Sequence, residues 1–351
     1  MTQRIGPVHA RPTQDEGLPL TVSQARNLFL VWRIYQRRSE SVAASFGLTT
    51  CYYHYSWEEK SKFHKLISYG LKATRSISDL LRHRPVVVFV QLPPTPLLYI
   101  VTLYSLATGA RVVADCHNAM VCSSWGKWPF TRDCLAHAAA VLVHNVDVYD
   151  LAKLSAINCV VMRDPLPQIR IGVPKSRVRA KLDLAKRRYI IIPWSFAPDE
   201  PVAEMFEAAR SCPDVAFVMT WFPERLPAQL KSATPPNLNM TGFLPVEDFN
   251  DLFAHAAASL VLTTREGTQP SAASESMVLN VPLIVSDMET AHKLYGDAPV
   301  YVANTAEGIA SGVRTAIAQR PELQQRMRVF LQQYKAELDR EIDLVKRRLA
   351  F

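Results

Sequence analysis

The stretch ASLVLTTREGTQPSAASESMVLNVPLIVSD, residues 258–287, holds two short apolar runs separated by a polar turn and a run of small residues. The runs ASLVLTT and VPLIVSD have the length and composition of buried strands. The segment SAASESMV between them is predicted to continue a helix whose first turn contains Pro270, a residue suited to that position. A strand, a helix and a second strand in this order predict a parallel β-α-β unit, because parallel neighbours need a crossover connection.

The same alternation of apolar runs and helical patterns extends along most of the 351 residues. Near-continuous apolar strands between helices predict parallel sheets that are covered on both faces. The proline-rich segment 164–175 is typical of a linker. We therefore expect an N-terminal domain over 1–165, a C-terminal domain over 166–320 and C-terminal helices over 321–351. Packing of these C-terminal helices on the N-terminal domain is one possible arrangement. The predicted strands lie at 28–32, 86–91, 111–115, 140–145, 188–195, 216–221, 238–243, 258–264, 281–287 and 298–303.

Residues 265–275 have the chemistry of a binding site. In doubly wound sheets, ligands bind beyond the carboxyl ends of the strands, which is where Glu266 and Gly267 follow the first strand of the quoted stretch. The start of the helix after Pro270 offers backbone amides and a helix dipole to a phosphate. Glu275 can accept hydrogen bonds from the two vicinal hydroxyls of a ribose, and Glu266 those of a sugar beyond the phosphates. Groups for a phosphate, a ribose and a sugar together predict a nucleotide-sugar site. No GxGxxG motif occurs in the sequence, which argues against dinucleotide binding.

The segment EGTQPSAASESMVLNVPLIVSD resembles the donor-site signature of GT-B glycosyltransferases of the family 4 type, in which EG…E-A-M…G-x-P-V-V-x-S-D is usual. Its two glutamates are nine positions apart rather than eight, and Asn280 replaces the usual Gly. Asn also tolerates left-handed backbone angles. The resemblance implies a UDP- or GDP-linked donor that is bound without a metal or other cofactor, and it implies a catalytic Glu266. The predicted donor-binding residues are Ser195, Gly267, Thr268, Gln269, Pro270, Ser271 and Glu275, with Arg265 as a substitute for the basic residue that related enzymes place near Ser195, where this sequence has Asp199 and Glu200.

Three further segments resemble the β-mannosyltransferases that elongate chitobiosyl-diphosphodolichol. QLPPTPLL (91–98), VVADCHNAM (112–120) and PWSFAPDEP (193–201) are similar to their Q-N-P-P, D-W-H-N and S-W-T-P-D-E-D elements. The resemblance implies that His117 contacts the transferred sugar and positions the reacting centre. Together, the resemblances imply the α/β GT-B fold, with two Rossmann-like doubly wound parallel-sheet domains facing a cleft. The stereochemistry stays open, because family 4 implies retention and the mannosyltransferases imply inversion.

The loop WRIYQRRSE at 32–40 follows the first predicted strand and mixes basic with aromatic side chains. GT-B enzymes receive the acceptor at this position. We therefore predict that Arg33, Tyr35, Arg37 and Arg38 bind an anionic glycan or a lipid diphosphate. The same composition suits nucleic acid, but no nucleic-acid motif accompanies it, so we predict no nucleic-acid partner.

The net charge of +8 lies mostly in the first half of the chain. Residues 1–165 contain 18 Lys and Arg against 11 Asp and Glu, and residues 166–351 contain 22 against 21. A basic half indicates an anionic partner or a solvated basic face. Both interpretations are open, and the first includes peripheral contact with an anionic membrane.

Two segments bear on that membrane contact. Residues 54–81 combine apolar side chains with Lys62, Lys65 and Lys72. This pattern suits either a helix at a membrane interface or an ordinary amphipathic helix whose apolar face packs on the sheet. The uncharged stretch 86–107 is long enough to span a bilayer, but its three prolines favour a buried strand, a loop and a helix.

The combined prediction is a nucleotide-sugar-dependent hexosyltransferase that acts on a lipid-linked glycan in polysaccharide or glycoconjugate biosynthesis. The six cysteines form no CxxC pair and the N-terminus has no apolar signal-peptide core, so we expect a cytoplasmic protein, peripheral at the inner face of the cell membrane. One alternative is a GT-B nucleotide-sugar 2-epimerase, which needs no acceptor loop. Another is a non-catalytic subunit that binds a lipid carrier or a partner transferase, although a scaffold has no chemical need for Glu266, Glu275 and His117.

Overall fold

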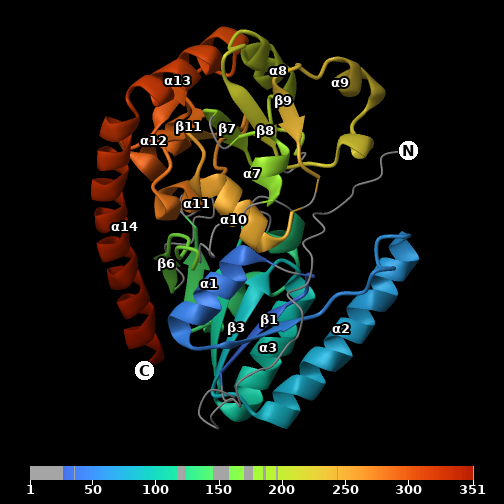
Figure 1. The fold of residues 1–351 in the computed structure, drawn as a ribbon. Coiled ribbons are helices and arrows are strands. Elements are labelled where there is room, and N and C mark those ends of the chain that lie inside the picture. Colours follow the sequence, from blue (N-terminus) through green and yellow to red (C-terminus); the bar gives the residue numbers. More distant parts are fainter. Residues whose placement is uncertain are drawn as a thin grey trace. The chain divides into compact units, whose positions relative to one another are not determined.

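The chain is described by a computed structural model, which divides into two compact units (Figure 1). Of the described residues, the N-terminal unit contains those from Asn27 to Pro165 and from Ala336 onward, and the C-terminal unit contains those within Leu166–Lys335. The described residues are 27–34, 36–117, 120, 124–144, 158–169, 177–184, 187–194, 197–242 and 244–350.

Within the described part of the N-terminal unit, six parallel strands form one sheet in the order β2-β1-β3-β4-β5-β6. The strands are β1 (Asn27–Val31), β2 (Thr49–Tyr52), β3 (Val87–Leu92), β4 (Arg111–Cys116), β5 (Ala140–Val143) and β6 (Cys159–Val161). The helices are α1 (Arg37–Phe46), α2 (Lys62–His83), α3 (Thr95–Thr108), the 3-10 turn η2 (Ser124–Lys127) and α5 (Thr131–His137).

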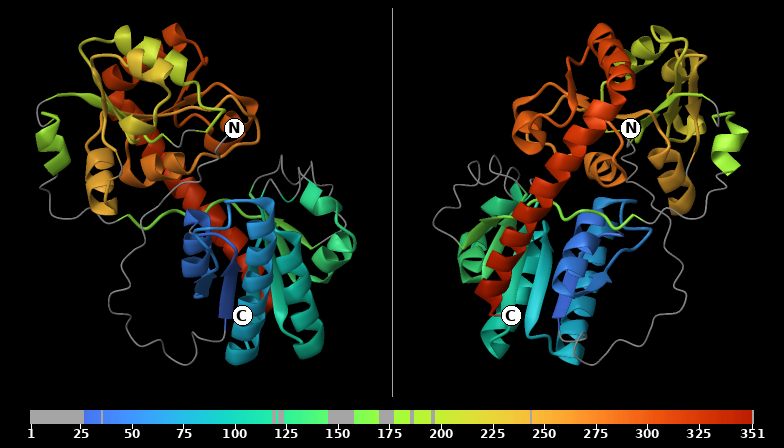
Figure 2. Two further views of the ribbon diagram at one scale, coloured as in Figure 1. Left: turned by 90° about the vertical axis from the view of Figure 1, so that its right-hand side faces the viewer. Right: turned by 60° about the vertical axis from the view of Figure 1, so that its left-hand side comes forward.

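The strands of this sheet are buried on both faces, as their apolar runs predict. Val88 and Val90 of β3 belong to the core on the side of α2, α3 and α5, which lie in a row (Figure 2, left). Phe89 points to the opposite face, where its ring lies 5.0 Å from that of Phe46 in α1. The end of α14 (Arg320–Leu349) also belongs to this unit, since Glu341 accepts hydrogen bonds of 2.9 Å from the backbone and side chain of Arg163.

The described part of the C-terminal unit repeats the plan with a parallel sheet in the order β12-β11-β10-β7-β8-β9. The strands are β7 (Tyr189–Ile192), β8 (Ala216–Met219), β9 (Leu238–Met240), β10 (Ala258–Val261), β11 (Leu283–Ser286) and β12 (Val300–Val302). The helices are α7 (Arg177–Lys181), α8 (Val202–Arg210), the 3-10 turn η4 (Pro223–Arg225), α9 (Ala228–Ser232), α10 (Val246–Ala254), α11 (Ser271–Leu279), α12 (Glu289–Tyr295) and α13 (Ala306–Ala318). One face of the sheet packs against α8 and α13, and the other against α10 and α11.

All ten predicted strands are present, and the prediction of two doubly wound parallel sheets is confirmed. The sequence analysis missed β2 and β6, which are the two edge strands of the N-terminal sheet. The uncharged stretch 86–107 forms the buried strand β3 and the helix α3, as its prolines predict. A search of the described helices finds none with the length and hydropathy needed to cross a membrane.

The interpretation of 54–81 as a helix with its apolar face on the sheet is wrong. Helix α2 buries Ser68, Lys72, Ser76 and Leu80, whereas most of its large apolar side chains are exposed. Lys72 therefore does not belong to a basic surface, because it is buried with only 1% of its area exposed.

Candidate functional site

The loop and helix after β10 form the first candidate site, within the C-terminal unit. Gly267 has a φ of 72°, a conformation that favours glycine, and its N–H donates to Thr290 Oγ1 at 2.9 Å. Helix α11 begins at Ser271, directly after Pro270, and ends at Asn280 with a φ of 52°. The expectation that Asn280 can replace the usual glycine in a left-handed conformation is thus confirmed.

Helix α11 packs closely against the sheet through small side chains. Ala272, Ala273 and Ser276 are buried, and the Ser276 hydroxyl is hydrogen-bonded to Ser259 of β10. Glu275, on the same helix, has only 5% of its surface exposed. The N-cap residue Pro270 has no side-chain hydrogen bond to the helix. A short helix with a buried carboxylate and an uncapped N-terminus therefore lies at the carboxyl edge of the sheet.

Polar contacts fix the backbone where this loop leaves β10. The hydroxyl of Thr263 donates to Asp199 Oδ2 at 2.7 Å, and the Thr263 N–H donates to Ser286 Oγ at 3.0 Å. Asn304 Nδ2 donates to the Thr263 carbonyl at 2.9 Å, and the Ser286 hydroxyl donates to Asn304 Oδ1 at 2.8 Å. The loops after β7, β10, β11 and β12 are therefore tied together at one edge of the sheet. The sequence analysis did not identify these ties.

Glu266 has a structural contact that its predicted role at the sugar did not include. Its two carboxylate oxygens accept hydrogen bonds of 3.1 Å each from the backbone N–H groups of Glu289 and Thr290. These residues begin α12, so Glu266 caps that helix from a distant part of the sequence.

The other predicted donor residues have different surroundings. Arg265 and Ser271 are exposed, and Thr268 is half-buried. The amide oxygen and nitrogen of Gln269 are both buried and have no hydrogen-bond partner among the described residues. Such an amide requires an explanation, because buried polar groups are nearly always satisfied. Ser195 lies outside the described residues.

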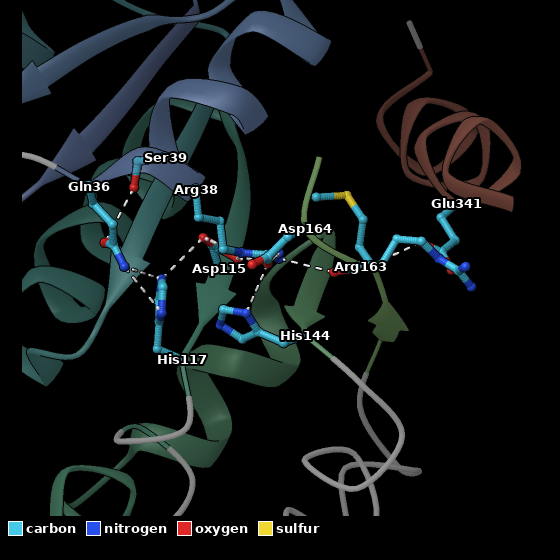
Figure 3. A network of polar contacts seen from close by, with 10 residues as sticks. Gln36, Arg38, Ser39, Asp115, His117, His144, Arg163, Asp164 and Glu341 are labelled. Atoms are coloured by element: carbon cyan, nitrogen blue, oxygen red, sulfur yellow. Dashed lines mark hydrogen bonds and ion pairs between the residues drawn. The ribbon is translucent and has the colours of Figure 1, made fainter. Parts of the chain in front are cut away.

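The second candidate site lies at the carboxyl edge of the N-terminal sheet and centres on Arg38 (Figure 3). The guanidinium of Arg38 donates to Asp115 Oδ1 from Nε at 3.1 Å and from Nη2 at 3.0 Å. It also forms an ion pair with Asp164 and donates to the Met162 carbonyl at 3.2 Å. Burial alone would raise the pKa of both carboxylates, but Arg38 and the neighbouring histidines hold each pKa well below its usual range. Both acids are therefore ionised at neutral pH.

His117 lies beside this ion network, directly after β4. Its Nε2 is 3.1 Å from the amide nitrogen of Gln36 and 3.6 Å from Asp115 Oδ2. Burial and the neighbouring His144 lower the pKa of His117 to about 4, against the opposing effect of Asp115. At neutral pH His117 is therefore an uncharged imidazole that can exchange hydrogen bonds with a hydroxyl group.

His144 is a site residue that the sequence analysis missed. It follows β5, its ring centroid is 4.4 Å from that of His117, and its Nδ1 is 3.2 Å from Asp164. The His144 Nε2 atom is buried without a partner among the described residues. The sequence indicates this role of His144 only weakly, because a single histidine after a strand does not reveal which side chains lie beside it in the fold. Its position after AVLV, at a strand's carboxyl end, was the available hint.

The prediction that Arg38 binds the acceptor must be corrected. Its side chain is only 6% exposed and is occupied by two internal carboxylates, so it stabilises the loop rather than meeting an acceptor. Arg33 is exposed, as an acceptor ligand should be. Tyr35 and the side chain of Arg37 lie outside the described residues.

No group of three or more His, Cys, Asp or Glu side chains in the described part of the chain is arranged to hold a metal ion. The expectation that donor binding needs no metal stays a prediction.

The fold is shared with solved structures of very different sequence. An α,α-trehalose-phosphate synthase from Burkholderia xenovorans, solved with glucose-6-phosphate, is 12% identical with a TM-score of 0.67, and the match covers 93% of this chain and all of that one. HepE from Anabaena, in complex with UDP-glucose, is 11% identical with a TM-score of 0.63, covering 92% and 98% of the two chains. The chain therefore has the GT-B fold of two Rossmann-like domains.

The same fold also occurs in a UDP-N-acetylglucosamine 2-epimerase, which is 14% identical with a TM-score of 0.60 over 86% of this chain and 89% of that one. No protein-family model and no curated protein sequence matches the chain. At these identities the likeness establishes the GT-B fold and leaves the activity to the chemistry of the site.

Proposed function

We propose that the protein is a glycosyltransferase that moves a sugar from a nucleotide-sugar donor to a glycan acceptor. One observation carries the proposal. The first turns of α11 combine an uncapped helix N-terminus with the buried carboxylate of Glu275, and the preceding loop holds the Gln269 amide, whose polar atoms have no partner among the described residues. A diphosphate, a ribose and a base edge require these kinds of group.

The donor half of the proposal assigns a role to each of these groups. The first amides of α11 hold the diphosphate, whose developing charge they stabilise as the nucleoside diphosphate departs. Glu275 accepts hydrogen bonds from the ribose hydroxyls, and the side-chain amide of Gln269 forms hydrogen bonds with the nucleotide. The small side chains of α11 let the ligand approach the backbone. The proposed donor is UDP- or GDP-linked, and its binding uses no metal.

His117 and Glu266 are proposed to act at the transferred sugar. As a neutral imidazole beside Gln36 and Asp115, His117 can hold a sugar hydroxyl without repelling a developing positive charge at the anomeric carbon. Glu266 would contact the sugar with the carboxylate that also caps α12. The resemblance to family 4 supports the role of Glu266, and the resemblance to the β-mannosyltransferases supports that of His117.

The finer proposal is that the acceptor is a lipid-linked glycan in polysaccharide or glycoconjugate assembly, reached at the inner face of the cell membrane. The basic excess of residues 1–165 and the exposed Arg33 support an anionic acceptor. A nucleotide-sugar 2-epimerase is the alternative that the shared fold favours. An epimerase would change the donor in the absence of any acceptor, whereas a transferase would leave the sugar's configuration at C2 intact.

A screen of nucleotide sugars for thermal stabilisation tests the donor, and turnover with a membrane-lipid extract then tests the acceptor. We expect stabilisation by one nucleotide sugar and sugar incorporation into lipid. In that assay His117→Ala and Glu266→Gln should each lower turnover about 10²–10³-fold while nucleoside diphosphate affinity stays near the wild-type value. Glu307→Gln, at an exposed site on α13, is the control. Near-normal turnover of either variant removes that residue from the proposed chemistry, and C2 epimerisation without an acceptor selects the alternative.

A further inference from the structure

Helix α2 is inverted with respect to an ordinary amphipathic helix. The side chains that it buries, Ser68, Lys72, Ser76 and Leu80, follow one another at intervals of four residues and therefore form one face. Three of the four are polar or charged. A helix that packs on a sheet normally buries its apolar side chains. In α2 most of the large apolar side chains face outward instead, and this exposure needs an explanation.

Specific polar contacts hold the buried face in place. Lys72 Nζ lies 2.6 Å from Glu58 Oε2, and the Trp32 indole N–H donates to Ser76 Oγ at 2.9 Å. The Tyr53 hydroxyl donates to Asp79 at 2.7 Å. These partners define the orientation of the helix, because rotating it to bury the apolar side chains would break them and leave buried polar groups unsatisfied.

The opposite side of α2 carries a stripe of exposed apolar side chains. Phe63 and Leu66 are each 69% exposed, and Leu81 at the other end is 64% exposed. The pairs Phe63 with Leu66, Ile67 with Leu71 and Ile77 with Leu81 are three or four residues apart, and at about 100° per residue all six members fall on one side of the helix. The stripe spans about 27 Å along the helix axis. We call it the outer stripe, and it consists of Phe63, Leu66, Ile67, Leu71, Ile77 and Leu81.

The neighbouring helix also exposes large apolar side chains. Helix α3 packs beside α2 on the same face of the sheet (Figure 2, left). Its Leu103 and Leu106 are 67% and 65% exposed. Soluble monomeric proteins rarely expose large apolar patches unless these meet a partner or a membrane.

The exposed charges that α2 itself carries have one sign. The exposed charged side chains of α2 are all basic: Lys62, Lys65, Arg75 and Arg82. The acidic residue of the helix, Asp79, is half-buried and bound by Tyr53. A convex apolar stripe with basic residues beside it complements an anionic lipid surface, because the apolar side chains enter the acyl boundary while the long basic side chains reach the headgroups.

We propose that α2 is the element by which the protein docks on an anionic lipid bilayer, with the helix parallel to the membrane plane and the outer stripe inserted below the headgroups. The proposal supplies the membrane contact that a lipid-linked acceptor requires, and to that extent it rests on the proposed function. The inverted geometry of α2 is independent of the reaction. Lys72 takes no part in docking, because it is buried against Glu58.

Co-sedimentation with vesicles tests the docking, using phosphatidylcholine alone and phosphatidylcholine mixed with phosphatidylglycerol. Wild-type protein should bind the mixed vesicles at low salt, release at high salt and bind the neutral vesicles far less. The double variant Leu66→Ser/Leu71→Ser should weaken binding to mixed vesicles about tenfold or more. The double variant Lys62→Glu/Arg82→Glu, which reverses an exposed charge on each side of the stripe, should lose the preference for anionic lipid.

Matched controls change the same side-chain types elsewhere. Val246→Ser on α10 replaces an apolar residue that is 62% exposed, and Lys335→Glu on α14 reverses an exposed charge. Both controls should bind vesicles as the wild type does. Equal binding to neutral and anionic vesicles, or a stripe variant that binds like wild type, overturns the proposal.

Two further measurements, the oligomeric state and the nucleoside diphosphate affinity, show whether a second copy covers the outer stripe and test the docking separately from the proposed function. If the protein is a dimer that Leu66→Ser/Leu71→Ser converts to a monomer, a second copy covers the stripe and lipid docking is rejected. Nucleoside diphosphate affinity, measured on the same preparations, should be equal in wild type and stripe variant, which also shows that the variant is folded. A protein that docks on vesicles and binds no nucleotide would contradict the proposed function while leaving the docking intact.

Discussion

The two sheets present different chemistry at their carboxyl edges. The N-terminal edge holds charges in a buried network, in which Arg38 joins Asp115 and Asp164 beside two histidines. The C-terminal edge is tied by hydroxyl and amide groups, and it places the start of α11 and the carboxylate of Glu275 beyond the strands. The first arrangement fixes a rigid, ionised frame around His117, and the second leaves a helix N-terminus for an anionic ligand. We infer that the first edge serves positioning and the second serves binding.

Substitution of Arg38 should have the largest effect on stability, because buried charges hold the N-terminal edge, whereas hydroxyl and amide groups tie the C-terminal edge. Arg38→Met leaves the buried Asp115 and the half-buried Asp164 without their common cation, and we expect the free energy of unfolding to fall by about 3–5 kcal/mol. Urea unfolding measures the loss. The control Arg33→Met changes an exposed arginine in the segment between β1 and α1 and should alter stability by less than about 0.5 kcal/mol. Equal losses in the two variants would contradict a structural role for the Arg38 network.

The N-terminal edge should also give the protein a pH dependence. The folded protein holds the pKa of His117 at about 4, below the ordinary value of 6.5, so the unfolded chain takes up the proton first as the pH falls. The stabilisation is fully present above pH 6.5 and decreases as the pH falls toward 4, by a total of about 3 kcal/mol. Unfolding free energies across this window should decrease in the wild type and vary less in His117→Gln. Identical pH profiles for the two proteins would show that His117 is not the titrating group.

At the C-terminal edge, Glu275→Gln should weaken nucleoside diphosphate binding by about 1–3 kcal/mol, because the ribose loses a charged hydrogen-bond acceptor. The substitution keeps the volume of the buried side chain. Isothermal titration calorimetry gives the affinity, and Glu307→Gln is the matched control. An unchanged affinity in folded Glu275→Gln would remove the ribose assignment.

The smallest expected effect belongs to Glu266 as a helix cap. Glu266→Ala deprives the N–H groups of Glu289 and Thr290 of their acceptors and should lower stability by about 1 kcal/mol. Glu266→Gln retains one accepting oxygen and should lose less. Thermal or urea unfolding distinguishes the three proteins. If Glu266→Ala is as stable as the wild type, the capping contact contributes nothing to the fold.

The sequence predicted the features that depend on neighbouring residues. The β-α-β unit around α11, the position of Pro270 at the start of this helix and the left-handed Asn280 follow from one continuous segment; Pro270 is the N-cap residue and the helix begins at Ser271. The edge strands β2 and β6 were missed because they are only four and three residues long and partly exposed, so they lack the apolar run of a central strand.

Features that depend on distant residues were not predictable in the same way. The ion network joins Arg38, Asp115, His144 and Asp164 from four separate places in the chain, and nothing in the local pattern of Arg38 distinguishes a buried arginine from a surface one. In α2, the spacing of apolar residues predicted a stripe but not its direction. The direction depends on Glu58, Trp32 and Tyr53, which provide polar partners for the opposite face.

The claim that the start of α11 binds the nucleotide diphosphate can be tested directly by hydrogen–deuterium exchange. The amides of residues 268–274 should exchange more slowly when UDP or GDP is added, because the phosphate accepts hydrogen bonds from the first turn of the helix. The amides of α2, in the N-terminal unit, should be unaffected by the free nucleotide. Protection at 268–274 is the result that the account predicts. Nucleotide binding that protects another part of the chain and leaves these amides unchanged would contradict it.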